Sequence, residues 1–194
     1  MVAIVVTVSV IVMAVVYSAP FVWAGQTVTV SATVTSSLSC SAGGSSADFG
    51  TLSSGSITTA SPSIDVTNSC NSGGGCTLYV NDAGNASSPG LYAAAATGSP
   101  IILSSTATLS AGTEGYGIQA TTTGAGSGGT MTVASTYNKT SNDVGGLTVG
   151  TSQLASSTTA ISGRVISVGA LASISTLTKA GVYADTITYS CSGN

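Results

Sequence analysis

Short stretches in which apolar and polar residues alternate recur along the chain, and turns rich in glycine, serine and asparagine separate them. Alternation places every second side chain on the same face of a strand. Such stretches predict strands near residues 27–40, 56–69, 76–82, 99–109, 114–122, 130–137, 160–168 and 182–191. No helical period is evident outside the first 24 residues, and short strands joined by frequent turns predict an all-β sandwich or barrel.

The first 24 residues, "MVAIVVTVSVIVMAVVYSAPFVWA", carry no charge and are apolar almost throughout. This pattern predicts a secretory signal peptide that is cleaved near Ala24, and therefore a secreted or cell-surface protein. A retained membrane anchor is the alternative, because about 20 apolar residues suffice to span a bilayer. The remaining residues, 25–194, fit one domain with its own core.

The charge and the residue types exclude several classes of function. The net charge is −3 with only three basic residues, so binding to nucleic acid or to an anionic membrane surface is not expected. The chain has no histidine and no G-x-S-x-G motif, which argues against the common nucleophilic catalytic sites. Asp82 and Asp143 stand in "NDAGN" and "SNDVGG", where we expect turn aspartates that bond to their own backbone; calcium binding there is the weaker alternative. We therefore predict no enzymatic activity, no metal and no cofactor.

The chain has four cysteines, which is an even number: Cys40, Cys70, Cys76 and Cys191. In an exported chain this predicts two disulfides. Metal binding is the weaker interpretation, because the spacing between Cys70 and Cys76 is wrong for a zinc knuckle.

The first and last stretches of the predicted domain indicate whether its sandwich has all of its strands. In "GQTVTVSATV", residues 25–34, the apolar residues Val28, Val30, Ala32 and Val34 fall on one face. In the last predicted strand Tyr183, Asp185, Ile187, Tyr189 and Cys191 share a face, and the chain ends three residues later. An immunoglobulin-like sandwich of about seven strands needs a last strand that covers an edge and part of the core. No residues follow Asn194 to form that strand, so we expect an immunoglobulin-like sandwich that is incomplete.

Several segments, in order, resemble the spore-coat-protein-U type of chaperone–usher pilin subunit. They are "TVTVSATVTSSLSC", "DFGTL", "IDVTNSC", "CTLYVNDAG", "YGIQA" and "AGVYADTITY". The segment "GTEGYGIQA" is also similar to surface domains of the WxL kind.

The pilin resemblance implies a division of the chain into a donor extension, residues 25–35, and an incomplete pilin-like sandwich, residues 36–194. The face formed by Val28, Val30, Ala32 and Val34 would complete the sandwich of the next subunit. The alternative, from the residues alone, is that 27–40 is the first strand of a self-contained sandwich. The resemblance also implies a disulfide between Cys40 and Cys70, which leaves Cys76 for Cys191; the pairing of Cys40 with Cys191 and of Cys70 with Cys76 is the alternative.

The function that the resemblance implies is that of a structural subunit in a surface fibre serving adhesion or biofilm formation. Its partners would be copies of itself, with a periplasmic chaperone and an outer-membrane usher during assembly. A monomeric, surface-attached binding module for carbohydrate or another ligand is the alternative.

Overall fold

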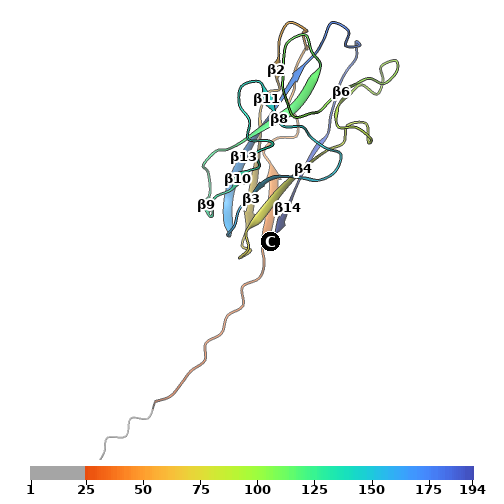
Figure 1. The fold of residues 1–194 in the computed structure, drawn as a ribbon. Helices are drawn as coiled ribbons and strands as arrows, with labels where there is room; N and C mark the ends of the chain where they lie inside the picture. The colour runs from red at the N-terminus through yellow and green to blue at the C-terminus, as the bar shows by residue number, and fades with distance from the viewer. Residues whose placement is uncertain (1–24) are drawn as a thin grey trace, which may run out of the picture. The chain divides into compact units, whose positions relative to one another are not determined.

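The computed structural model describes residues 25–194 and shows an all-β protein without a helix in that range (Figure 1). The compact unit is Thr35–Asn194, and residues 25–34 belong to a separate unit. The predicted signal peptide lies outside the described residues. No apolar helix of membrane-spanning length occurs between residues 25 and 194.

The larger sheet is built around one long strand, β13 (Ile161–Ser173). One side of β13 pairs with β3 (Ile64–Cys70) and β2 (Thr58–Thr59), and the other side pairs with β8 (Gly115–Thr122) and β9 (Ser127–Gly128). β1 (Leu38–Ala42) adds to the free side of β3 and forms an edge of the sheet. All these pairings are antiparallel.

The second sheet has the strand order β10-β12-β4-β14 and is also antiparallel. Its strands are β10 (Thr132–Val133), β12 (Ser152–Ser156), β4 (Cys76–Asp82) and β14 (Ile187–Gly193). β14 pairs only with β4, so it is an edge strand within the described part of the chain. Two small ribbons pair β5 (Gly90–Tyr92) with β6 (Ile101–Leu103), and β7 (Ala107–Thr108) with β11 (Asp143–Val144).

Alternating apolar residues of the two sheets meet in one core, which gives a sandwich-like arrangement. Val66, Ile118 and Ile166 come from the first sheet and are fully buried. Leu78 and Leu154 from the second sheet are fully buried in the same cluster. The alternation seen in the sequence therefore marks the residues that hold the two sheets together.

The sequence located some strands closely and missed others. The predicted strand 76–82 coincides with β4, and 114–122 nearly coincides with β8. Strand β12 was missed, because "SQLAS" contains no β-branched residue and shows no clear alternation. The prediction of a strand over 27–40 is wrong for most of its length, since regular pairing begins only at Leu38.

Candidate functional site

A groove of about 900 Å³ opens between the two edge strands β1 and β14, and we call it the edge groove. Ala42 of β1 lies on one side of it, and Ile187 and Tyr189 of β14 lie on the other. The segments that follow β1 and precede β14 extend these sides through residues 44–52 and 178–185. The remaining lining residues come from both sheets and their connections: Ala60, Ile64, Leu91, Tyr116, Ala170 and Ile174.

Apolar side chains that are only partly covered line much of the edge groove. Phe49, Ile64 and Ile174 pack against the core cluster, yet each keeps some exposed surface. On the other side, exposure alternates along the last strand and the segment before it: Tyr183, Asp185, Ile187 and Tyr189 are half-buried, and the residues between them are exposed. This confirms the shared face that the sequence predicted for these four residues. The groove thus joins an apolar surface to an edge of β14 that no other strand of residues 25–194 covers.

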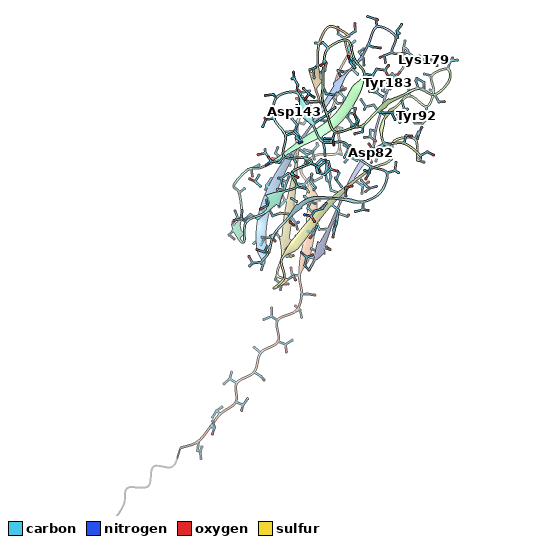
Figure 2. All side chains as sticks on the ribbon, viewed as in Figure 1. Asp82, Tyr92, Asp143, Lys179 and Tyr183 are labelled. Carbon is cyan, nitrogen blue, oxygen red and sulfur yellow. A yellow bond between two sulfur atoms is a disulfide. The ribbon has the colours of Figure 1, made fainter. Side chains whose placement is uncertain are left out.

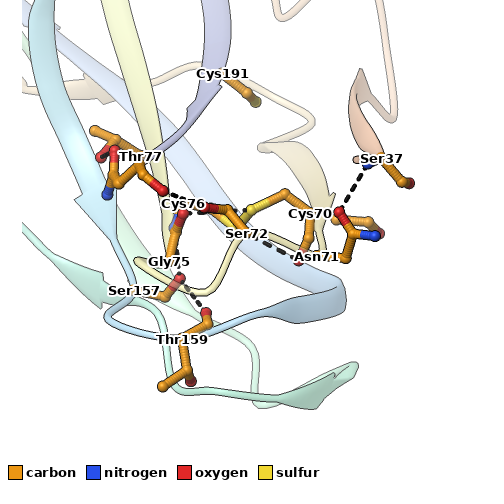
Figure 3. Close-up of a disulfide and its surroundings, with 12 residues drawn as sticks. Ser37, Cys70, Asn71, Ser72, Gly75, Cys76, Thr77, Ser157, Thr159 and Cys191 are labelled. Atoms are coloured by element: carbon orange, nitrogen blue, oxygen red, sulfur yellow. Dashed lines mark hydrogen bonds between the residues drawn. A yellow bond between two sulfur atoms is a disulfide. The ribbon is translucent and has the colours of Figure 1, made fainter. Parts of the chain in front are cut away.

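A disulfide joins Cys40 of β1 to Cys191 of β14, and their Cα atoms lie 6.1 Å apart. Each cysteine lies two residues along its strand from a groove-lining residue, Ala42 or Tyr189. The other disulfide joins Cys70 to Cys76, at the end of β3 and the start of β4 (Figure 3). Both predicted disulfides formed, but the pairing of Cys40 with Cys70 and of Cys76 with Cys191 is wrong.

Strand register explains the correction. Cys40 lies opposite Asn68 on β3, whereas Cys70 lies opposite Leu38, so Cys40 and Cys70 are displaced by two residues. Cys191 lies opposite Leu78 on β4, again two residues from Cys76, which lies opposite Gly193. Directly opposed side chains share a face, so Cys40 points to the same side as the buried Asn68 and meets Cys191 across the sandwich.

The tight turn between β3 and β4 allows the second disulfide. Gly75 has φ of +90°, and a Cβ at this position would lie 2.1 Å from the carbonyl oxygen of Ser157. A residue with a side chain would therefore clash there and would also strain the backbone. Glycine lets the chain reverse within five residues and brings the Cα atoms of Cys70 and Cys76 to 6.2 Å.

Asn71 holds the chain where it enters the compact unit (Figure 3). The backbone N–H of Ser37 donates to its Oδ1 at 2.7 Å, and its Nδ2 donates to the carbonyl oxygen of Thr35 at 2.8 Å. This two-sided contact fixes residues 35–37 beside the end of β3, which is also the end of the sandwich that carries both disulfides.

Residues 25–34 contain no strand, and their side chains are exposed. The exposed fractions are 81% for Val28, 89% for Val30 and 84% for Val34, and Ala32 is exposed as well. Soluble proteins normally bury such a row of valines. The four predicted donor residues are therefore uncovered and retain the alternation that the sequence predicted.

A buried acid, Asp82, and a half-buried one, Asp185, lie together beside the edge groove. Asp82 ends β4 with 1% of its surface exposed, and no N–H or hydroxyl group among residues 25–194 donates a hydrogen bond to its carboxylate oxygens. Burial, together with a hydrogen bond to Asp185 and the charge of Asp185, raises the pKa of Asp82 to about 8. The nearby backbone N–H groups of Gly84 and Gly90 do not reach hydrogen-bond geometry, but they offset part of this rise.

Asp185 connects this pair to the groove. Its Oδ2 accepts a hydrogen bond of 3.0 Å from the hydroxyl of Tyr116, which is 2% exposed on β8. Its Oδ1 accepts from the backbone N–H of Gly84 at 3.3 Å. Burial and the charge of Asp185 raise the pKa of Tyr116 well above its usual value and that of Tyr189 to about 12, so both hydroxyls keep their protons near neutrality.

The sequence predicted that Asp82 and Asp143 are turn aspartates bonded to their own backbone, and this prediction is wrong for both. The side chain of Asp82 is buried at the last position of β4. Asp143 is exposed, but it lies in β11 and accepts a hydrogen bond from the hydroxyl of Thr108. No group of three or more potential metal ligands occurs between residues 25 and 194. The alternation of the strand contained the signal that was missed. Leu78, Val80 and Asp82 occupy every second position, so Asp82 lies on the same buried face as the two apolar residues.

Comparison with known proteins gives no relative: no family model, no curated protein and no solved structure matches the chain.

Proposed function

We propose that the protein is a structural subunit of an extracellular fibre, in which the exposed strand-like segment of one copy fills the edge groove of the next. The observation that carries this proposal is the free edge of β14 beside a half-covered apolar groove. One added strand supplies hydrogen-bond partners to the unpaired backbone groups of that edge and covers the apolar surface at the same time.

The length of residues 28–34 and the alternation of their apolar side chains suit the edge groove. The half-buried face from Tyr183 to Tyr189 covers seven residues, and so does the apolar face from Val28 to Val34. Seven strand residues extend over about 20 Å. Burying each valine stabilises the joined subunits by roughly 1.5–3 kcal/mol, and the ladder hydrogen bonds add to this.

Two features favour a neighbour over the chain's own segment as the occupant. Asn71 fixes Thr35 and Ser37 at the end of the sandwich where Cys40 and Cys191 are bonded. To enter its own groove, the chain would have to reverse direction at once and pass this covalent link. A neighbour's segment meets no such obstacle, and because donor and acceptor surfaces differ, the contact repeats head to tail into a fibre.

The wider role follows from the resemblance of the sequence to pilin subunits. The fibre would serve adhesion or biofilm formation at the cell surface. A periplasmic chaperone and an outer-membrane usher would protect and order the subunits before assembly. No catalytic reaction and no cofactor is part of this proposal.

A second candidate is a monomeric binding module. It is favoured by the size of the edge groove, which at about 900 Å³ lies within the range of small-molecule sites. In that case the groove would hold a ligand, and residues 25–34 would act as a linker.

Electron microscopy of the exported, purified chain tests the proposal. We expect filaments, and we expect an excess of a capped peptide of residues 25–36 to shorten them, because the peptide occupies the groove without supplying a further subunit. A chain that stays monomeric at high concentration and does not bind the peptide would contradict strand donation and favour the binding module.

A further inference from the structure

We infer that Asp82 and Asp185 share a single proton, and that this proton holds the groove-lining segment 183–185 in the shape that accepts a donated strand. The pH dependence that follows rests on the proposed function; the shared proton does not. Asp82 is here a positioning residue, since it acts on the groove through Asp185.

The geometry requires a proton. Asp82 is almost completely buried, and neither of its oxygens receives a hydrogen bond from residues 25–194. An ionised carboxylate in that position would have lost water without a replacement, and it would also face the charge of Asp185. A protonated Asp82 instead donates its O–H to Asp185. The Tyr116 hydroxyl and the Gly84 N–H already donate to Asp185, so the oxygens of Asp185 are the acceptors in the pair.

The ionisable groups around the pair support the same assignment. Tyr116 of β8 and Tyr189 of β14 face the acids, and both phenols stay neutral because their pKa values are raised. No lysine or arginine is among the groups that shift the pKa of Asp82. A second negative charge in the pair would therefore have no compensation, and a proton is the simplest means of removing it.

The segment that carries Asp185 is held by backbone hydrogen bonds on both sides of this residue. Ala184 exchanges two backbone hydrogen bonds with Tyr92, of 2.8 and 3.0 Å, and the carbonyl of Thr186 accepts one from Ala83 at 2.9 Å. Figure 2 shows Tyr92 and Tyr183 near each other on the side of the domain that carries Asp82. Asp185 is half-buried, so it can turn toward water, whereas Asp82 cannot.

Loss of the proton should therefore move Asp185. When both acids are charged, repulsion favours the conformation in which Asp185 leaves the pair and turns toward the open groove. A carboxylate would then occupy space that a valine of the donated strand needs, and the donor would have to desolvate it. Uptake of the strand should weaken as the pH rises through the pKa of Asp82, which is about 8.

The test uses an exported chain that carries Val30→Asp, because this chain keeps its groove but should not donate its own segment. A fluorescent, capped peptide of residues 25–36 serves as the probe, since it contains no ionisable side chain. We expect at least a tenfold loss of affinity between pH 6 and pH 9, and no such loss after the further change Asp82→Asn. Asp143→Asn is the matched control, because Asp143 is an exposed carboxylate away from Asp82 (Figure 2), and it should leave the pH dependence intact.

A second measurement covers the case in which Asp82→Asn fails to fold. In the infrared spectrum of the folded Val30→Asp chain, one protonated carboxyl should persist at pH 6.5, where exposed carboxyls are ionised. Absence of that band would overturn the shared proton. Equal peptide affinity at pH 6 and pH 9 would overturn the control of the groove but leave strand donation standing. Failure of the peptide to bind at any pH, with the infrared band present, would instead contradict the proposed function alone.

Discussion

Cys40 and Cys191 join the edge strands of opposite sheets, with their Cα atoms 6.1 Å apart at a sequence separation of 151. The link ties β1 to β14, and both remain edge strands of their sheets within residues 25–194. It thereby lets a sandwich with an unfilled groove keep its two sheets together.

The two disulfides should differ in how much they stabilise the fold. Loop-closure entropy predicts a contribution of about 5 kcal/mol for the long loop and about 2 kcal/mol for the six-residue loop. The double variant Cys40→Ser/Cys191→Ser should therefore lose more unfolding free energy in urea than Cys70→Ser/Cys76→Ser. Peptide mapping of the unreduced protein should recover Cys40 with Cys191. The opposite order of stability, or a peptide joining Cys40 to Cys70, would contradict this assignment.

Asn68 should be a destabilising residue. It is fully buried on β3, and neither its Oδ1 nor its Nδ2 has a hydrogen-bond partner among residues 25–194. Leaving such groups unpaired costs about 1–3 kcal/mol. Replacement by leucine, which has a similar shape and no polar atoms, should raise the melting temperature. A lower melting temperature for Asn68→Leu would show that the amide has a partner in solution.

Tyr116→Phe should destabilise the fold without changing its packing. The variant keeps the buried ring but removes the donor that lies 3.0 Å from Oδ2 of Asp185. A hydrogen bond to a charged group contributes about 1.5–3 kcal/mol, so the unfolding free energy should fall by this amount. Tyr79→Phe is the control, because Tyr79 lies in the neighbouring sheet on β4 and is only half-buried. Similar losses for both variants would argue against a special role for Tyr116.

The pH dependence of stability should carry the sign of a raised carboxyl pKa. The folded protein holds a proton on Asp82 up to about pH 8, whereas the unfolded chain releases it near the ordinary value of 3.8. Between these values the folded state binds more protons, so stability should fall as the pH rises from about 4 to about 8 and then level off. Thermal melts across this range provide the measurement. A melting temperature that rises over the same interval would contradict the assignment.

The sequence predicts the features that neighbouring residues determine, such as which strand residues share a face, better than it predicts which strands pair. Alternation located β4 and β8 closely, because each buries every second residue in the core. It also predicted the face that Tyr183, Asp185, Ile187 and Tyr189 present to the groove. Alternation could not show that residues 25–37 lack a partner strand, since a strand with an apolar face has the same pattern wherever it pairs.

The errors concern relationships between strands. In the register of β1 with β3, Cys40 lies two residues from the position opposite Cys70. In the register of β4 with β14, Cys191 likewise lies two residues from the position opposite Cys76. These registers decide which cysteines pair. Cysteine spacing does not contain that information. Asp82 was placed in a turn because "NDAGN" has turn composition, but tertiary packing buries its side chain beside Asp185.

Comparing Val30→Asp with Thr29→Asp tests the central claim most directly. The two residues are neighbours in an exposed segment, and each change adds one negative charge. Val30 shares its face with Val28, Ala32 and Val34, so in a donated strand it would enter the groove while Thr29 faces outward. Burying an unpaired carboxylate costs several kcal/mol. Both monomers should melt at the same temperature as the unmodified monomer, and only Val30→Asp should abolish filaments. Equal filament yields for the two variants, or a Val30→Asp monomer that is itself destabilised, would contradict donation to a neighbour.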